Sequence, residues 1–130
     1  MTKRAGVLLG AVMLVSALAV PAQAAVGDLV TETRQDRWVG ATVPYEYGGA
    51  IQGGGVAGSD DGATIVLEAC MLYFGAPVFC STGTGTGYVE VPMSVPVCLP
   101  GLWQGLSMAT FDGEPLWVLT PPVNLVTCPR

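Results

Sequence analysis

The amino-acid sequence predicts an all-β fold, either a small antiparallel β-sandwich or a small barrel, on three observations. After the first 24 residues, no window keeps apolar side chains at the i, i+3, i+4 and i+7 spacing of a helix. Valine, threonine, tyrosine and tryptophan, which favour strands, are plentiful. Turn signals built from glycine, proline and aspartate recur about every ten residues, which predicts roughly six to eight short strands.

Residues 1–24 have the pattern of a cleavable secretory signal peptide. Lys3 and Arg4 give a positive start, an uncharged run rich in Leu, Val and Ala follows, and Pro21 interrupts it. Residues 22–24 read Ala-Gln-Ala, a small-x-small cleavage site. The uncharged run is shorter than the roughly 20 apolar residues that a spanning helix needs. We therefore expect cleavage after Ala24, no membrane insertion after cleavage, and a secreted product.

The chain that follows the signal peptide, residues 25–130, is acidic. It contains ten Asp and Glu residues and three arginines, a net charge of −7, and it has no lysine or histidine. Nucleic-acid binding draws most of its affinity from clustered Lys and Arg, so we expect no nucleic-acid partner. Its length suits one domain, which we expect to be a monomer that binds an unknown protein or small-molecule ligand.

Four cysteines follow the signal peptide, an even number in the oxidising compartment expected for an exported protein: Cys70, Cys80, Cys98 and Cys128. Two disulfides are therefore expected, and three connectivities are open. We prefer the pairs Cys70–Cys80 and Cys98–Cys128, because a Gly-Ala-Pro turn signal lies between the first two cysteines. A zinc site would need paired C-x2-C spacings and usually histidine. The spacings here are 10, 18 and 30, so we expect no metal.

The individual strands follow from local patterns. Trp38–Tyr47 alternates but contains Pro44, which indicates an edge strand or two short strands. Thr64–Phe74 is apolar on both faces except at Glu68, as in a central strand. Tyr88–Val97 has the cleanest alternation, and its two prolines place it at the edge of a sheet.

Two stretches are expected to be loops. Gly48–Gly62 is glycine-rich with little side-chain bulk, and Thr82–Gly87 is a Thr-Gly repeat that we do not expect to pack. Toward the C-terminus, Ser107–Phe111 and Leu116–Thr120 flank a turn signal and predict a hairpin, and Val123–Thr127 predicts a last strand. Among the possible architectures, an immunoglobulin-like sandwich is the first choice.

Catalysis is restricted by the residues that the chain lacks. Without His or Lys there is no Ser-His, Cys-His or Ser-Lys pair, so Ser107, in a sequence that resembles a nucleophile elbow, has no base. Only carboxylate chemistry remains, with Glu68 and Glu90 in apolar strands as a candidate acid–base pair. The simpler interpretation is that Glu68 and Glu90 each lie on a solvent-exposed face of a strand. We predict that the protein is not an enzyme.

For two further motifs, we prefer a structural interpretation to a functional one. Gly53–Gly58 matches G-x-G-x-x-G, but the dinucleotide fingerprint needs a strand before it and a helix after it. Asp60 and Asp61 could supply oxygen ligands to calcium, but the other acidic positions of a calcium loop are missing, and a solvated turn is the preferred interpretation. We therefore expect no cofactor.

Binding remains as the expected function. Leu99, Leu102 and Trp103 follow Cys98 in an apolar loop that a disulfide would anchor, and a rigid loop of this kind suits a small secreted inhibitor. The first hypothesis is thus a secreted, non-catalytic binding module, with inhibition as one form of it. The alternatives are a structural or surface-associated envelope or extracellular protein and, third, a carboxylate-dependent hydrolase.

Overall fold

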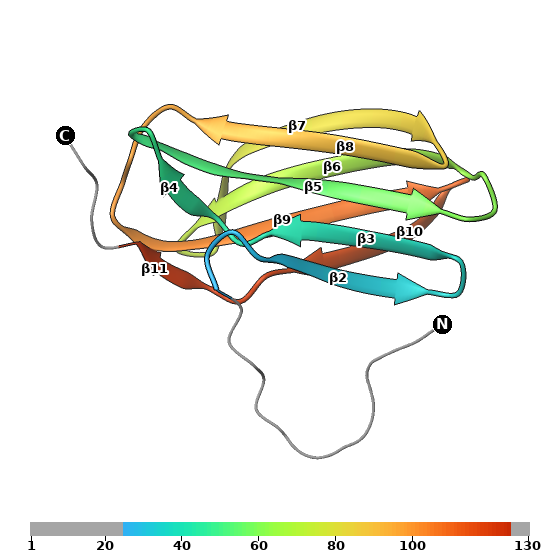
Figure 1. The fold of residues 1–130 in the computed structure, drawn as a ribbon, viewed down its shortest axis with the longest axis horizontal. Helices are drawn as coiled ribbons and strands as arrows, with labels where there is room; N and C mark the ends of the chain where they lie inside the picture. The colour runs from blue at the N-terminus through green and yellow to red at the C-terminus, as the bar shows by residue number, and fades with distance from the viewer. Residues whose placement is uncertain (1–24, 126–130) are drawn as a thin grey trace, which may run out of the picture.

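The computed structural model describes residues 25–125, which form two antiparallel β-sheets packed face to face (Figure 1). The predicted signal peptide, its cleavage site and Cys128 lie outside these residues. No helix long and apolar enough to cross a membrane occurs in the described part of the chain. The all-β prediction is confirmed, and the division into two separately hydrogen-bonded sheets favours the sandwich over the barrel.

The first sheet, called here the β5 sheet, has the strand order β2-β3-β5-β8. The short strand β4 pairs with the first residues of β5, beyond the end of β3. Its strands are β2 (Leu29–Arg34), β3 (Arg37–Thr42), β4 (Tyr45–Tyr47), β5 (Ala50–Ser59) and β8 (Tyr88–Val95).

The second sheet, the β6 sheet, has the order β10-β9-β6-β7, and β11 pairs with the beginning of β9. The chain passes from the β5 sheet into the β6 sheet after β5 and after β8, and returns after β7. Its strands are β6 (Thr64–Tyr73), β7 (Ala76–Thr86), β9 (Gly101–Phe111), β10 (Glu114–Leu119) and β11 (Val123–Leu125).

The core fills the space between the two sheets with alternate residues of each strand. Its largest fully buried side chains come from both sheets and include Trp103, Phe111, Ile51, Ile65 and Leu67. The segment Thr64–Phe74 is confirmed as a central strand, since β6 lies between β7 and β9. The prediction for Tyr88–Val97 is confirmed as well: β8 pairs only with β5 among the described residues, and it ends at Val95.

The prediction of a loop over Gly48–Gly62 is wrong, because most of this segment is β5, the centre of its sheet. Inward-facing glycines leave room here for side chains of the opposite sheet. A Cβ on Gly53 would lie 2.8 Å from the Met71 Cε, and one on Gly55 would overlap the Ser107 Oγ. The Gly53–Gly58 motif therefore lies within a strand that is followed by another strand, which is no setting for a dinucleotide-binding turn.

The Thr-Gly repeat at Thr82–Gly87 also forms a strand, contrary to the prediction, and belongs to β7. Its threonines are exposed while Gly83 and Gly85 face β8. A Cβ on Gly83 would lie 2.8 Å from Val91 Cγ2, and one on Gly85 would overlap the carbonyl oxygen of Tyr88. Alternate glycines thus let the edge strands of the two sheets approach closely on this side of the sandwich.

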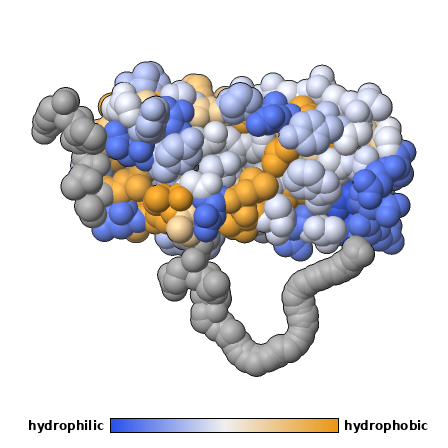
Figure 2. Space-filling view, viewed as in Figure 1, coloured by the Kyte–Doolittle hydropathy of each residue, from blue (hydrophilic) through white to orange (hydrophobic). Residues whose placement is uncertain are grey.

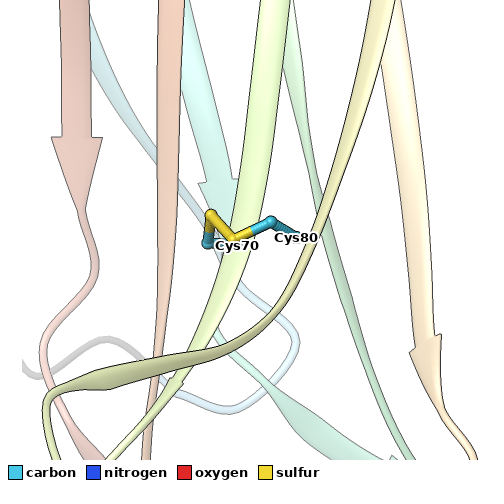
Figure 3. Close-up of a disulfide and its surroundings, with 2 residues drawn as sticks. All are labelled: Cys70 and Cys80. Carbon is cyan, nitrogen blue, oxygen red and sulfur yellow. A yellow bond between two sulfur atoms is a disulfide. The ribbon is translucent and has the colours of Figure 1, made fainter.

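The predicted disulfide Cys70–Cys80 is confirmed. The two cysteines are directly opposite each other on β6 and β7, with their Cα atoms 4.1 Å apart (Figure 3). Cys98 is disulfide-bonded as well. Its predicted partner, Cys128, lies outside the described residues.

Replacing Ser107 by alanine is expected to stabilise the fold. Ser107 is fully buried on β9, and its Oγ has no hydrogen-bond partner among the described residues. An unsatisfied buried hydroxyl costs about 1–3 kcal/mol, so its removal should raise the free energy of unfolding by about 1 kcal/mol after some loss of packing. Urea denaturation measures this change, with the exposed Ser94→Ala as a neutral control. A Ser107→Ala variant less stable than the wild type would contradict the expectation.

Candidate binding site

Of the predicted binding residues, Leu99 lies in the loop that joins β8 to β9, whereas Leu102 and Trp103, predicted in the same loop, belong to the beginning of β9. Three hydrogen bonds tie this loop and the beginning of β9 to the rest of the sandwich. The Trp103 indole N–H donates to the carbonyl of Leu99, and the Tyr73 hydroxyl donates to the carbonyl of Pro100, both at 2.8 Å. The Phe74 backbone N–H donates to the carbonyl of Leu102, also at 2.8 Å. The loop at Leu99 and Pro100 and the beginning of β9 at Leu102 are therefore held in place.

Aromatic packing explains why this loop keeps its path. The Tyr73 ring lies against Phe74 and Trp103, with centroid distances of 4.6 and 4.9 Å. Gly101, with a φ of +145°, passes directly beside these rings, so that a Cβ there would lie 2.7 Å from Tyr73 Cε1. Only glycine lets the backbone approach the ring pair this closely.

The three predicted binding residues have different roles in this arrangement. Trp103 is only 1% exposed and belongs to the core, so it anchors the loop. Leu99 and Leu102 are exposed. Phe74, in the neighbouring turn, is exposed beside them and was not predicted. Its position immediately before Gly75, in a turn rather than a strand, is the sequence signal that could have identified it.

Further apolar residues lie on the outside of the β6 sheet, where Gln104 separates Leu102 from the others on β9. Their central members are Trp117, which is 60% exposed, Leu119 at 42% and Met108 at 37%. The strand register places Met108 directly opposite Trp117, and Leu106 directly opposite Leu119. We call this surface the apolar face, and it consists of Val66, Leu102, Leu106, Met108, Trp117 and Leu119.

Strand β9 explains why this face is apolar. The residues that it turns into the core are mostly small, with Gly105, Ser107 and Ala109 between Trp103 and Phe111. A Cβ on Gly105 would overlap the carbonyl oxygen of Thr42, so the opposite sheet leaves no space for bulk there. The strand consequently places its larger apolar residues outside, where Leu102 and Met108 are exposed and Leu106 is half-buried.

The two candidate carboxylates for catalysis lie on opposite outer faces of the sandwich. Glu68 lies on β6 between the core residues Leu67 and Ala69 and is directly opposite Met108. Glu90 lies on β8 between the core residues Val89 and Val91. With the whole core between them, the two carboxylates cannot act on one substrate bond. Ser107 is buried in the core.

The Asp60–Asp61 turn lies at the end of the sandwich that carries the β2–β3, β5–β6 and β9–β10 turns, where Figure 2 shows hydrophilic residues gathered. The Asp61 carboxylate is already engaged, by a hydrogen bond from the Ser59 hydroxyl and by Arg37 at 3.1 Å. These contacts, chiefly the one from Ser59, hold the pKa of Asp61 below its usual value. Arg37 also reaches Asp112 at 3.6 Å. This arrangement fits the predicted solvated turn.

One group of potential metal ligands occurs in residues 25–125, and it consists of Glu68, Cys70 and Cys80. Both of its sulfur atoms belong to the disulfide and are not available as thiolates. Comparisons with models of protein families, with curated proteins and with solved structures found no match. The function is therefore inferred from the geometry of this chain.

Proposed function

We propose that this protein is a secreted, non-catalytic binding module that places its apolar face on a protein partner. The observation that carries the proposal is the exposure of Trp117, Leu119 and Met108 side by side on the outer face of the β6 sheet. Contiguous apolar surface of this kind marks interaction sites, because its burial against a partner is favourable. Tryptophan is also the residue type most enriched among the contacts that dominate binding energy.

The rigid loop extends this surface. Leu99 and Leu102 lie in a segment that is already held by three hydrogen bonds, so binding would cost little additional conformational entropy. A hydrogen-bonded apolar loop beside an apolar sheet face fits an inhibitor or another stoichiometric partner better than it fits an enzyme. The partner should offer an apolar surface of similar extent.

Secretion and the finer fold description belong to the same proposal. The signal-like pattern of residues 1–24 supports export, and the Cys70–Cys80 disulfide suits an oxidising compartment. The crossing of the chain between sheets after β5, β7 and β8 supports an immunoglobulin-like sandwich. In such sandwiches the outer face of a sheet is a natural surface for association.

The proposal is tested by capture of a partner and by variants of the apolar face. The purified protein is immobilised and exposed to culture supernatant and to a panel of extracellular proteases, and the bound protein is identified by mass spectrometry. Affinity is then measured for the wild type and for the double variant Trp117→Ser/Leu119→Ser. Each large apolar side chain contributes about 1.5–3 kcal/mol on burial, so we expect the double variant to bind at least about 100-fold more weakly.

Tyr47→Ser is the matched control, since Tyr47 is an exposed aromatic residue on β4 in the other sheet. It should bind the partner as the wild type does. An equal loss of affinity in Tyr47→Ser and in the double variant would refute the assignment of the apolar face. Self-association with no captured protein would instead support the structural alternative.

A further inference from the structure

Strand β2 forms an edge of the β5 sheet (Figure 1), and within residues 25–125 it pairs with β3 alone. All of its residues except Val30 are exposed. A hollow of about 770 Å³ is lined by residues of β2 and of β10, so the edge strands of the two sheets do not close against each other on this side of the sandwich. The free edge of β2 is therefore accessible to a further strand.

The other long edge strands each contain a proline, and β2 contains none. Pro92 lies in β8, Pro115 in β10 and Pro77 in β7. A proline has no N–H to offer to a further strand, and proline on an edge is one of the means by which proteins avoid edge-to-edge pairing. Of the four edge strands with six residues or more, β2 is thus the one that keeps every backbone donor.

The free backbone groups of β2 belong to alternate residues. Arg34 and Arg37 close the two-residue turn between β2 and β3, so they exchange both of their backbone hydrogen bonds. Because these bonds alternate along an antiparallel pair, the N–H and C=O groups of Leu29, Thr31 and Thr33 point away from β3. None of these groups is hydrogen-bonded within residues 25–125. They are available to a strand that lies along this edge.

The two arginines in the described part of the chain differ in their partners. Arg37 contacts the carboxylates of Asp61, Asp112 and Glu114. Arg34 is exposed and forms no ion pair within residues 25–125. It is also directly opposite Arg37, an arrangement of like charges that is unfavourable in a sheet. A carboxylate from another chain would offset this repulsion.

Asp28, immediately before β2, is a carboxylate on the same face of the strand as Arg34 and at its other end. Its carbonyl oxygen accepts a hydrogen bond from the Val43 N–H at 2.8 Å, which extends the pairing of β2 with β3 by one position. One oxygen of its carboxylate accepts a hydrogen bond from the Ala25 N–H at 2.9 Å. The edge therefore carries an acidic group at one end and a basic group at the other, so it is complementary in charge to an antiparallel copy of itself.

We propose that two copies of this chain pair along their β2 edges, antiparallel, about a two-fold axis at Thr31. In this register Thr31 is opposite the Thr31 of the second copy, and Leu29 is opposite Thr33 at both ends. Each of these three facing pairs exchanges two backbone hydrogen bonds, which gives six. Asp28 of each copy is opposite Arg34 of the other, so two ion pairs form at the ends of the paired strands.

The charges of β2 select this register over its neighbours. The free backbone groups can meet only if the register shifts by steps of two residues. A shift by one step places Glu32 opposite Glu32 in one direction and opposite Asp28 in the other, and both arrangements bring like charges together. Larger shifts leave a single facing pair of β2 residues. Charges that would discourage pairing with most other strands thus favour a second copy of this one.

The dimer is a property beyond the proposed function, and it differs from the monomer expected from the sequence. It is a closed pair, because each copy uses its one β2 edge, unlike the open-ended self-association expected of a structural protein. The pairing uses the edge of the β5 sheet, whereas the apolar face is the outer face of the β6 sheet. Either proposal can therefore fail without the other.

Sedimentation velocity of the purified protein over a series of concentrations tests the proposal. We expect a monomer–dimer equilibrium with a Kd of about 100 µM or tighter, in the range of small interfaces. Added salt should weaken it by at least about threefold, since the two ion pairs are exposed. A protein that stays monomeric at about 1 mM, or that forms larger species than a dimer, would overturn the proposal.

Thr31→Pro removes the central backbone donor of the dimer, and no hydrogen bond between β2 and β3 uses that donor, so the fold should be retained. We expect this variant to dimerise at least about tenfold more weakly than the wild type. Thr31→Val is the matched control, because it keeps the N–H and the strand propensity, and it should dimerise as the wild type does. Undiminished dimerisation of Thr31→Pro would place the contact elsewhere and overturn the proposal.

Charge reversal tests the register without touching the backbone. Arg34→Asp should weaken dimerisation by at least about tenfold, because Asp28 then meets a second carboxylate at each end. The double variant Asp28→Arg/Arg34→Asp reverses both ion pairs and should restore the Kd to within about threefold of the wild type. Failure of the double variant to recover would contradict the register. Dimerisation that is lost in Trp117→Ser/Leu119→Ser but kept in Thr31→Pro would assign self-association to the apolar face instead.

Discussion

Gly54→Ala is expected to lower the free energy of unfolding by about 3–5 kcal/mol, a large part of the total for a small domain. Gly54 has a φ of +136°, which disfavours any residue with a Cβ. That Cβ would overlap the carbonyl oxygen of Val91 and lie 3.0 Å from the Cα of Pro92. Both obstacles are backbone atoms of the neighbouring strand β8, so the variant cannot relax by moving a side chain.

Gly48→Ala separates the cost of backbone strain from the cost of the overlap with β8. Gly48 also has a positive φ, +66°, but an added Cβ would meet no atom within 4 Å. Gly48→Ala should therefore lower the free energy of unfolding only by the cost of backbone strain, about 1–2 kcal/mol. Chemical denaturation monitored by circular dichroism measures both variants. Equal unfolding midpoints for Gly54→Ala and Gly48→Ala would show that the contact of the added Cβ with β8 contributes nothing to the loss of stability.

The parts of the fold that could be predicted from the sequence are those in which one strand carries its own signal. Tyr88–Val95 alternates without interruption, and the edge position follows from prolines that cannot donate a hydrogen bond. The Cys70–Cys80 pair could be predicted because a turn signal lies midway between two cysteines in a short segment. Both inferences need only local information.

The glycine-rich strands could not be predicted in this way, because their cause lies in the opposite sheet. Isolated from its surroundings, a stretch such as Gly53–Gly55 has low strand propensity. In the folded protein the same glycines are needed, since Met71 and Ser107 fill the space where their side chains would be. The favourable packing exceeds the cost of placing glycines in a strand, and the sequence of β5 alone does not indicate that packing.

Strand β9 shows why the candidate site was also only partly predicted. Leu102, Leu106 and Met108 alternate and would be expected to face a core, yet they face outward. The inward positions are small because the β5 sheet approaches closely, as the overlap at Gly105 shows. The sequence therefore predicted an accessible Leu102, which the structure shows to be exposed, but gave no reason to place Trp117 outside and Trp103 inside.

Trp103→Ala is expected to destabilise the fold by about 3–5 kcal/mol, the usual cost of removing a large buried aromatic side chain. Trp103 is almost fully buried, and its indole N–H is the donor that holds the carbonyl of Leu99. The variant should therefore also release the loop, which hydrogen exchange can follow at the Phe74 amide bonded to Leu102. A larger increase in the exchange rate there than in β6 would show local release in addition to lower global stability.

Trp117→Ala is the matched control on the adjacent strand, and the comparison separates folding from binding. Trp117 is 60% exposed, so its removal should change stability by no more than about 0.5 kcal/mol. On the proposed function, this variant should nevertheless lose much of the affinity for the partner. Thermal unfolding should thus rank Trp117→Ala as the more stable of the two variants. Affinity measurements should give the opposite order, with Trp117→Ala as the weaker binder. A large loss of stability in Trp117→Ala would mean that the apolar face packs against other parts of the chain rather than being available to a partner.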